Sequence, residues 1–133
     1  MNLTKFRARA IIKRDGQYLL IHRWKNGHEY FSFPGGGKEE DETPQETVVR
    51  EVFEETGFIV HVVKYIDTIK HDRQEHHYYL CEIDDGVLGQ GNGPEYDRQN
   101  PNNVYIPEFV DISTVTVPIY HEEIVQLIRR KDL

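Results

Sequence analysis

The chain has 133 residues, of which 38% are hydrophobic and 29% are charged, with a formal net charge of -7 and one cysteine. This length and composition favour one globular domain over residues 1–133 and exclude an intrinsically disordered chain. A single cysteine excludes an intrachain disulfide and a zinc site built on a cysteine pair. The acidic charge argues against a nucleic acid polymer as partner, because such binding requires a basic surface.

The N-terminal residues 1–16 lack an apolar core of signal-peptide length, and no apolar run is long enough to span a membrane. A lone cysteine, Cys81, also suits a reducing compartment. We therefore expect a cytoplasmic protein without a membrane partner.

Six segments have the composition or alternation of β-strands. They lie at residues 7–14, 17–23, 28–33, 58–69, 75–83 and 104–112. Asp15-Gly16 between the first two is typical of a tight hairpin turn. Proline and glycine at residues 34–37 predict the end of the third strand, and residues 89–103 predict a long loop.

Two helices complete the predicted order. Residues 44–56 follow a capping box, in which Thr43 is the N-cap and Glu46 reaches back to it, and Gly57 suits the left-handed residue after the helix. The apolar side of this helix is expected at Val48, Val49, Val52 and Phe53. Residues 121–130 predict the second helix. This mixture of strands and helices indicates an α/β (α+β) layered domain.

The central helix carries an unusual group of like charges. Glu51, Glu54 and Glu55 are three and four residues apart, so they share a narrow arc beside the apolar stripe. Each like-charge pair costs a few tenths of a kcal/mol, roughly 0.2–0.5. Glu54 and Glu55 also lie in the last turn, where the helix dipole disfavours anions. A solvated acidic face is one interpretation, and a divalent cation is the other, because carboxylates are the ligands that Mg²⁺ and Mn²⁺ prefer.

The wider segment favours the cation. Residues 36–58 read GGKEEDETPQETVVREVFEETGF. The positions that define the pattern are spaced along this segment, and in order they are Gly36, Glu42, Arg50-Glu51, Glu54-Glu55 and Gly57-Phe58. This pattern resembles the Nudix box of the MutT-like Nudix hydrolases, and every defining position matches. The resemblance implies the Nudix fold, a mixed β-sheet sandwiched between α-helices. It also implies hydrolysis of the pyrophosphate bond in a nucleoside diphosphate linked to another moiety.

The resemblance also assigns roles to residues. It implies that Glu51, Glu54 and Glu55, with the carbonyl of Gly36, bind Mg²⁺ or Mn²⁺, and that Glu42 supports the site. Arg50 is expected to orient a glutamate through its planar guanidinium group. The general base is either Glu51 or a glutamate outside the box, for which Glu95 in the long loop is the candidate. The number of metal ions stays open.

Three further residues are weaker candidates for substrate contacts. Arg23 and Lys38 could contact phosphates or be surface charges, and Trp24 could stack on a base or pack at an edge. The adjacent His76 and His77 point to opposite faces of a strand, so they cannot share one ion. Cys81 is expected to pack in the core rather than act as a nucleophile.

The function expected is therefore that of a metal-dependent hydrolase of a small nucleotide derivative. A nucleoside triphosphate, an oxidised nucleotide and a nucleotide sugar all remain open as substrates, and so does a homodimer. The alternative functions are a catalytically silent Nudix domain that senses a nucleotide, and a structural domain whose acidic helix is only solvated.

Overall fold

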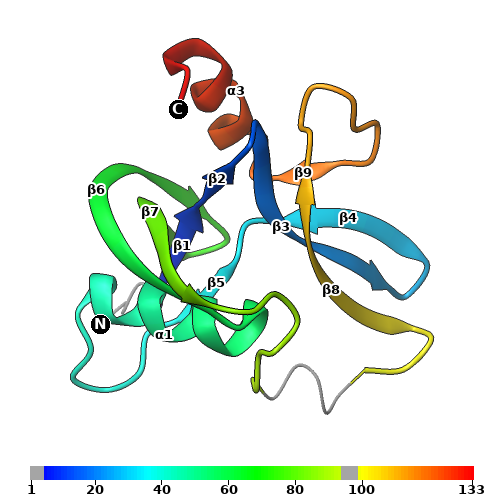
Figure 1. Ribbon diagram of the computed structural model, residues 1–133. Coiled ribbons are helices and arrows are strands. Elements are labelled where there is room, and N and C mark those ends of the chain that lie inside the picture. The colour runs from blue at the N-terminus through cyan, green and yellow to red at the C-terminus, as the bar shows by residue number, and fades with distance from the viewer. Residues whose placement is uncertain (1–4, 94–98) are drawn as a thin grey trace.

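The computed structural model describes residues 5–93 and 99–133. Within these residues, the elements are nine strands and two helices, arranged as Figure 1 shows. In chain order they are β1 Lys5–Ile11, β2 Lys13–Arg14, β3 Gln17–Lys25, β4 His28–Ser32, β5 Gly35–Gly37, α1 Pro44–Thr56, β6 Phe58–His71, β7 Gln74–Gly86, β8 Asn103–Val110, β9 Ile119–Tyr120 and α3 Glu122–Lys131.

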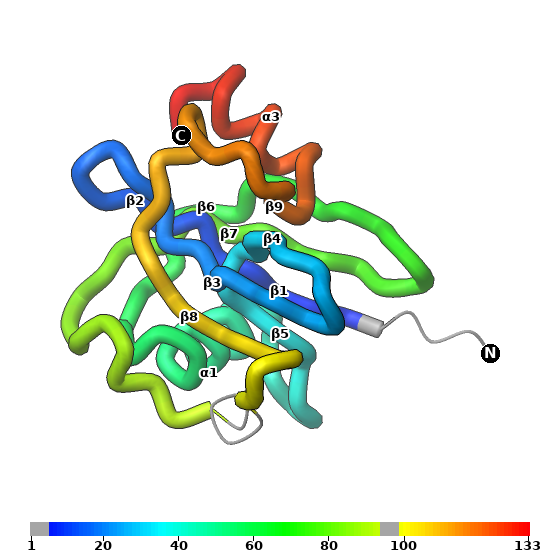
Figure 2. The backbone as a smooth tube through the Cα atoms, turned by 90° about the vertical axis from the view of Figure 1, so that its right-hand side faces the viewer, coloured from blue at the N-terminus to red at the C-terminus, as the bar shows by residue number. Residues whose placement is uncertain are grey.

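The strands form two sheets. One has the order β5-β1-β7-β6, and the other has the order β2-β3-β4-β9 with β8 paired to β3. Both sheets are mixed, because β1 runs parallel to β7 and β4 runs parallel to β9, while the other pairs are antiparallel. Figures 1 and 2 place α3 at the top of the molecule and α1 near the bottom, with the strands between them. The predicted mixed α+β fold is confirmed.

Two strand predictions need correction in detail. The segment at residues 7–14 is not one strand, because β1 and β2 lie in different sheets and separate at Ile12. The Asp15-Gly16 turn itself is as predicted, with φ of 53° and 78°, and it joins β2 to β3. Glycines 35–37 do not simply end a strand: they form β5, which pairs antiparallel with β1. A strand of glycines depends on this distant partner, since glycine has little β-propensity of its own.

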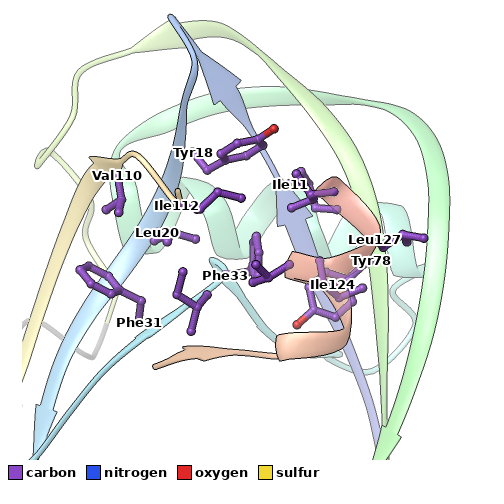
Figure 3. Packing of buried hydrophobic residues seen from close by; sticks show 13 residues of the cluster. Ile11, Tyr18, Leu20, Phe31, Phe33, Tyr78, Val110, Ile112, Ile124 and Leu127 are labelled. Atoms are coloured by element: carbon purple, nitrogen blue, oxygen red, sulfur yellow. The ribbon is translucent and has the colours of Figure 1, made fainter. Parts of the chain in front are cut away.

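Apolar side chains fill the space on both sides of β3, as its alternation requires. Leu20 belongs to the cluster under α3, which also contains Phe33, Tyr78 and Ile124 (Figure 3). Leu19 points the other way, into the cluster that α1 covers. The hydroxyl of Tyr18 donates to the carbonyl of Leu133, which ties the C-terminal end of the chain to β3.

Cys81 packs in the core, as expected. It is buried in the cluster that α1 covers, and burial raises the pKa of its thiol to about 12, so it packs as an apolar group.

In the described residues, no helix combines the length and apolar character that a membrane crossing requires.

Helix α1 has the predicted ends. The hydroxyl of Thr43 accepts from the backbone N–H of Glu46, whose carboxylate accepts from the N–H of Thr43, and Gly57 has φ 88°. The predicted apolar side is wrong at one position, because Phe53 is 37% exposed. Glu51 and Glu55 occupy the buried face instead, each 8% exposed. Two carboxylates therefore point inward where an apolar stripe would normally continue.

Candidate active site

A cleft of about 270 Å³ lies where the two sheets meet near α1. Strands β1 and β5 and helix α1 supply one part of its lining, and β3, β4, β8 and β9 supply the other. Glu51 and Glu55 line it together with the three glycines of β5. The structure thus brings two of the predicted glutamates and the predicted Gly36 into one cleft.

The glycines allow the buried carboxylates to approach the backbone. A Cβ atom on Gly36 would lie 2.5 Å from Cδ of Glu51 and 2.6 Å from its Oε2, well inside ordinary contact distance. The backbone N–H of Gly35 donates to Oε1 of Glu55 at 2.8 Å. Glycine is therefore required at position 36 for close packing against a carboxylate rather than for an unusual φ.

Arg50 organises the other carboxylates around it. Its guanidinium forms a two-pronged contact with Glu42, from Nε to Oε2 at 2.6 Å and from Nη2 to Oε1 at 3.1 Å. Nη1 donates to Oε1 of Glu51 at 3.0 Å and to Oε2 of Glu54 at 3.1 Å. Nη2 also donates to the carbonyl of Gly37 at 3.0 Å. One cation thus offsets much of the like-charge repulsion along α1 and joins the helix to β5.

The charges of this cluster follow from these contacts. The hydrogen bond from Arg50 holds the pKa of Glu42 down at about 2, with further help from the backbone of Glu39 and the hydroxyl of Thr47. The same bond to Glu42 raises the pKa of Arg50 above its ordinary value. Glu42 and Arg50 are therefore both charged at neutral pH, and their ion pair persists there.

The three box glutamates do not all face the same way. Glu51 and Glu55 line the cleft, while Glu54 accepts from Arg50. Within residues 5–93 and 99–133, no three histidine, cysteine, aspartate or glutamate side chains gather closely enough to form a metal cluster by themselves. Two carboxylates beside the glycine backbone of β5 still match the donor chemistry of a hard divalent cation that shares its coordination with a substrate.

The remaining predicted residues lie in three places. Arg23 lines the cleft and is 8% exposed, with its guanidinium 3.5 Å from the ring centre of Tyr105. Lys38 is exposed and donates to the backbone carbonyl of Glu39, and Trp24 stacks on His22 at 3.9 Å between ring centres, so neither belongs to the described lining. Glu95 lies outside the described residues.

Sequence reasoning missed several side chains of the cleft. Arg7 and Arg9 enter it from β1, and Tyr30, Tyr105 and Tyr120 enter it from the second sheet. The arginines alternate with Ala8 and Ala10, which are fully buried. This alternation of charged and small residues was the available signal, because it indicates a strand with one core face and one polar face. The tyrosines come from three separate strands, so no local pattern unites them.

His121 is a further residue of the lining that sequence reasoning missed. Its Nδ1 lies 2.6 Å from the hydroxyl of Tyr78, and its ring packs edge-on against His76 at 4.4 Å. Burial, reinforced by the charge of Arg9, lowers the pKa of His76 to about 3 and that of His121 to about 4. Both rings are therefore neutral at pH 7.

The family model described as the NUDIX domain matches residues 4–126. The chain belongs to the NUDIX domain family. This confirms the resemblance found in residues 36–58, and it extends the match over most of the chain.

Two curated relatives and one solved structure illustrate the range of this similarity. The 8-oxo-dGTP diphosphatase of Proteus vulgaris is 39% identical over 75 residues, which cover 55% of this chain and 67% of that protein. A MutT-like protein of Streptomyces ambofaciens is 47% identical over 55 residues, covering 41% of this chain and 34% of the relative. The match thus spans about a third of that relative's length. An ADP-ribose pyrophosphatase of Streptococcus suis has a TM-score of 0.66 at 24% identity over 89% of this chain and 81% of that chain, a likeness of fold.

Proposed function

We propose that this chain is a divalent-cation-dependent pyrophosphohydrolase that cleaves a small nucleoside diphosphate derivative. The observation that carries this proposal is the cleft in which Glu51 and Glu55 lie against glycine backbone while arginines enter from the neighbouring strand. Carboxylates that suit a cation, beside guanidinium groups that suit phosphate, match the charge stabilisation that phosphoanhydride hydrolysis needs. The family and the names of the relatives support the same reaction class.

In this proposal Glu51, Glu54 and Glu55, with the carbonyl of Gly36, hold Mg²⁺ or Mn²⁺. A cation held there would neutralise phosphate charge and lower the pKa of a bound water. The chain's part is to fix the carboxylates. Gly36 leaves room for the Glu51 carboxylate, and the N–H of Gly35 orients Glu55. Glu54 would turn from Arg50 toward the cation.

Arg50 acts in this proposal as a positioning residue rather than a catalytic one. It holds Oε1 of Glu51 at 3.0 Å while Glu42 grips its guanidinium from the other side. The contacts from Glu42 to Arg50 and from Arg50 to Glu51 limit the rotamers of the Glu51 carboxylate, the proposed metal ligand. Two glutamates remain candidates for the general base: Glu51 in the box and Glu95 in the long loop.

The size and charge of the cleft favour a small nucleotide. A volume of about 270 Å³ is near the lower end of ligand pockets, which run from roughly 300 to 1,000 Å³. Tyr30, Tyr105 and Tyr120 supply flat rings for a base or sugar, and the guanidinium of Arg23 lies 5.7 Å from the ring centre of Tyr30 and 3.5 Å from that of Tyr105. The net charge of -7 still argues against a nucleic acid polymer. A cytoplasmic location and a homodimer stay predictions.

The test is a hydrolysis panel with the wild type and Glu54→Gln. The panel contains nucleoside triphosphates, oxidised nucleotides and nucleotide sugars in Mg²⁺ or Mn²⁺. We expect turnover by the wild type and a loss of about 10- to 100-fold or more in Glu54→Gln, since a ligand has been neutralised. Glu122→Gln on α3 removes a charge from an exposed glutamate of the other helix and serves as the control.

Two outcomes would contradict the proposal. A Glu54→Gln variant as active as the wild type would show that Glu54 is not a metal ligand. Tight nucleotide binding by a folded wild type without any turnover would favour the alternative, a domain that senses a nucleotide.

A further inference from the structure

Two arginines of β1 face the cleft beside the glycine strand. Arg7 and Arg9 are two residues apart, so their side chains leave the same face of the strand. The β1–β5 register sets Arg7 opposite Gly37 and Arg9 opposite Gly35. The guanidinium groups therefore extend into the cleft next to the backbone against which Glu51 and Glu55 lie.

Neutral groups hold these two arginines. Arg7 donates from Nε to Oε1 of Gln74 at 3.0 Å. Arg9 donates from Nε to Nδ1 of His76 at 3.0 Å and from Nη1 to the carbonyl of Phe33 at 2.8 Å. Among the described residues, every ion pair made by an arginine belongs to Arg50. Within residues 5–93 and 99–133, the hydrogen bonds of Arg7 and Arg9 thus orient two positive charges through neutral acceptors.

The aromatic side chains of the cleft come from the other sheet. Tyr30 lies on β4, Tyr105 on β8 and Tyr120 on β9, and the ring centres of Tyr30 and Tyr120 are 5.6 Å apart. Arg23 on β3 packs against Tyr105. Within the described lining, β1 and β5 contribute only arginine and glycine. The cleft therefore has its three tyrosines on one sheet, where Arg23 packs against Tyr105, and Arg7 and Arg9 on the other sheet.

We propose that the cleft selects substrates with one organic end and terminal phosphates, that is, nucleoside triphosphates and their base-modified forms, over nucleotide sugars. This inference rests on the proposed function and narrows its substrate class. The tyrosines of β4, β8 and β9 receive the nucleoside. Arg7 and Arg9 receive the outer phosphates, whose oxygens match the fork of a guanidinium. A nucleotide sugar would set uncharged hydroxyls against these two cations, which rewards binding much less.

Matched substrate pairs with a common base test this inference. The pairs are UTP with UDP-glucose, GTP with GDP-mannose, and ATP with ADP-ribose, all in Mg²⁺. We expect the wild type to have a higher kcat/KM for the triphosphate in its preferred pair. Arg7→Gln should lower kcat/KM for the triphosphate about tenfold or more, the usual loss for one charge-assisted contact, and change that for the sugar by less than about threefold.

Arg7 is the sharper target, because Arg9 also supports the backbone of Phe33. Arg130→Gln, at an exposed position of α3, removes the same charge away from the cleft and is the matched control. If Arg7→Gln does not fold, as judged by circular dichroism, Arg7→Lys keeps the charge and loses the fork. As a readout without any variant, inorganic tripolyphosphate should inhibit the wild type competitively and more strongly than inorganic phosphate.

The outcomes separate the inference from the proposed function. If the folded wild type hydrolyses no member of any pair, the proposed function fails. If the wild type hydrolyses both members of a pair but prefers the nucleotide sugar, the proposed selection of terminal phosphates is wrong. The same holds if Arg7→Gln lowers kcat/KM equally for both members. In either case the proposed hydrolase function is retained. Tripolyphosphate that inhibits no better than phosphate would also overturn the inference.

Discussion

Replacement of Gly36 by alanine gives a sharp test of how the backbone and Glu51 fit together. The added Cβ would lie 2.5 Å from Cδ, 2.6 Å from Oε2 and 2.7 Å from Oε1 of Glu51. Ordinary non-bonded contacts of a carbon atom begin at about 3.5 Å, so the Glu51 carboxylate must move away by roughly 1 Å. A displacement of this size at a catalytic group costs about 100-fold in rate, or ~2.7 kcal/mol of activation free energy.

The neighbouring glycine supplies a matched control. A Cβ on Gly37 would meet nothing within 4 Å, so Gly37→Ala adds the same methyl group without moving Glu51. Gly35→Ala is unsuitable, because its Cβ would lie 2.2 Å from the backbone oxygen of Ala8 at φ +153°. Gly36 has no such φ, so we expect Gly36→Ala to change the free energy of unfolding by about 1 kcal/mol or less.

The assay is kcat/KM in Mg²⁺ for the best substrate of the panel, with thermal unfolding followed by circular dichroism. Gly36→Ala should lose about 100-fold and Gly37→Ala less than about threefold. A folded Gly36→Ala protein as active as Gly37→Ala would refute the reasoning that the position of Glu51 depends on a glycine at 36.

Two further predictions concern the charged groups around the cleft. Arg50→Lys keeps the positive charge but loses the two-pronged contact with Glu42. We therefore expect kcat/KM to fall about 10- to 100-fold and the free energy of unfolding to fall by about 1–2 kcal/mol. Equal activity of the wild type and Arg50→Lys would contradict this prediction. Folding lowers the pKa of His76 to about 3, so the unfolded state binds more protons below about pH 6.5 and stability falls on acidification toward pH 3. His76→Gln should weaken this dependence in urea unfolding at pH 7, 5 and 4. An unchanged pH profile in His76→Gln would count against this prediction.

Local signals in the sequence sufficed for helix α1. Its ends depend on Thr43, Glu46 and Gly57, all within a few residues of the helix they terminate. The Nudix box could be recognised for the same reason, since its positions are fixed by one loop and one helix. The error at Phe53 arose because hydrophobicity was taken as the guide to burial. In this helix, Glu51 and Glu55 occupy part of the buried face, a departure from the usual pattern that is expected at functional sites.

The rest of the cleft could not be predicted, because distant segments build it. Glycines 35–37 become a strand only through pairing with β1. That pairing sets Arg7 and Arg9 beside the box, although they precede it by about thirty positions in the sequence. Tyr105 and Tyr120 join from strands that pair with β3 and β4. Such contacts follow from sheet order and register, which local patterns do not specify.

The central claim is that this cleft hydrolyses a nucleotide pyrophosphate bond with the help of a divalent cation. The most direct measurement is phosphate-bond hydrolysis by the wild type across the nucleotide panel, titrated with Mg²⁺ and then with EDTA, beside Glu51→Gln. The prediction is turnover that requires the metal, stops in EDTA, returns with excess Mg²⁺ and falls by about 100-fold or more in Glu51→Gln. Equal turnover in EDTA, an unimpaired Glu51→Gln, or a folded wild type that hydrolyses none of the panel would contradict it.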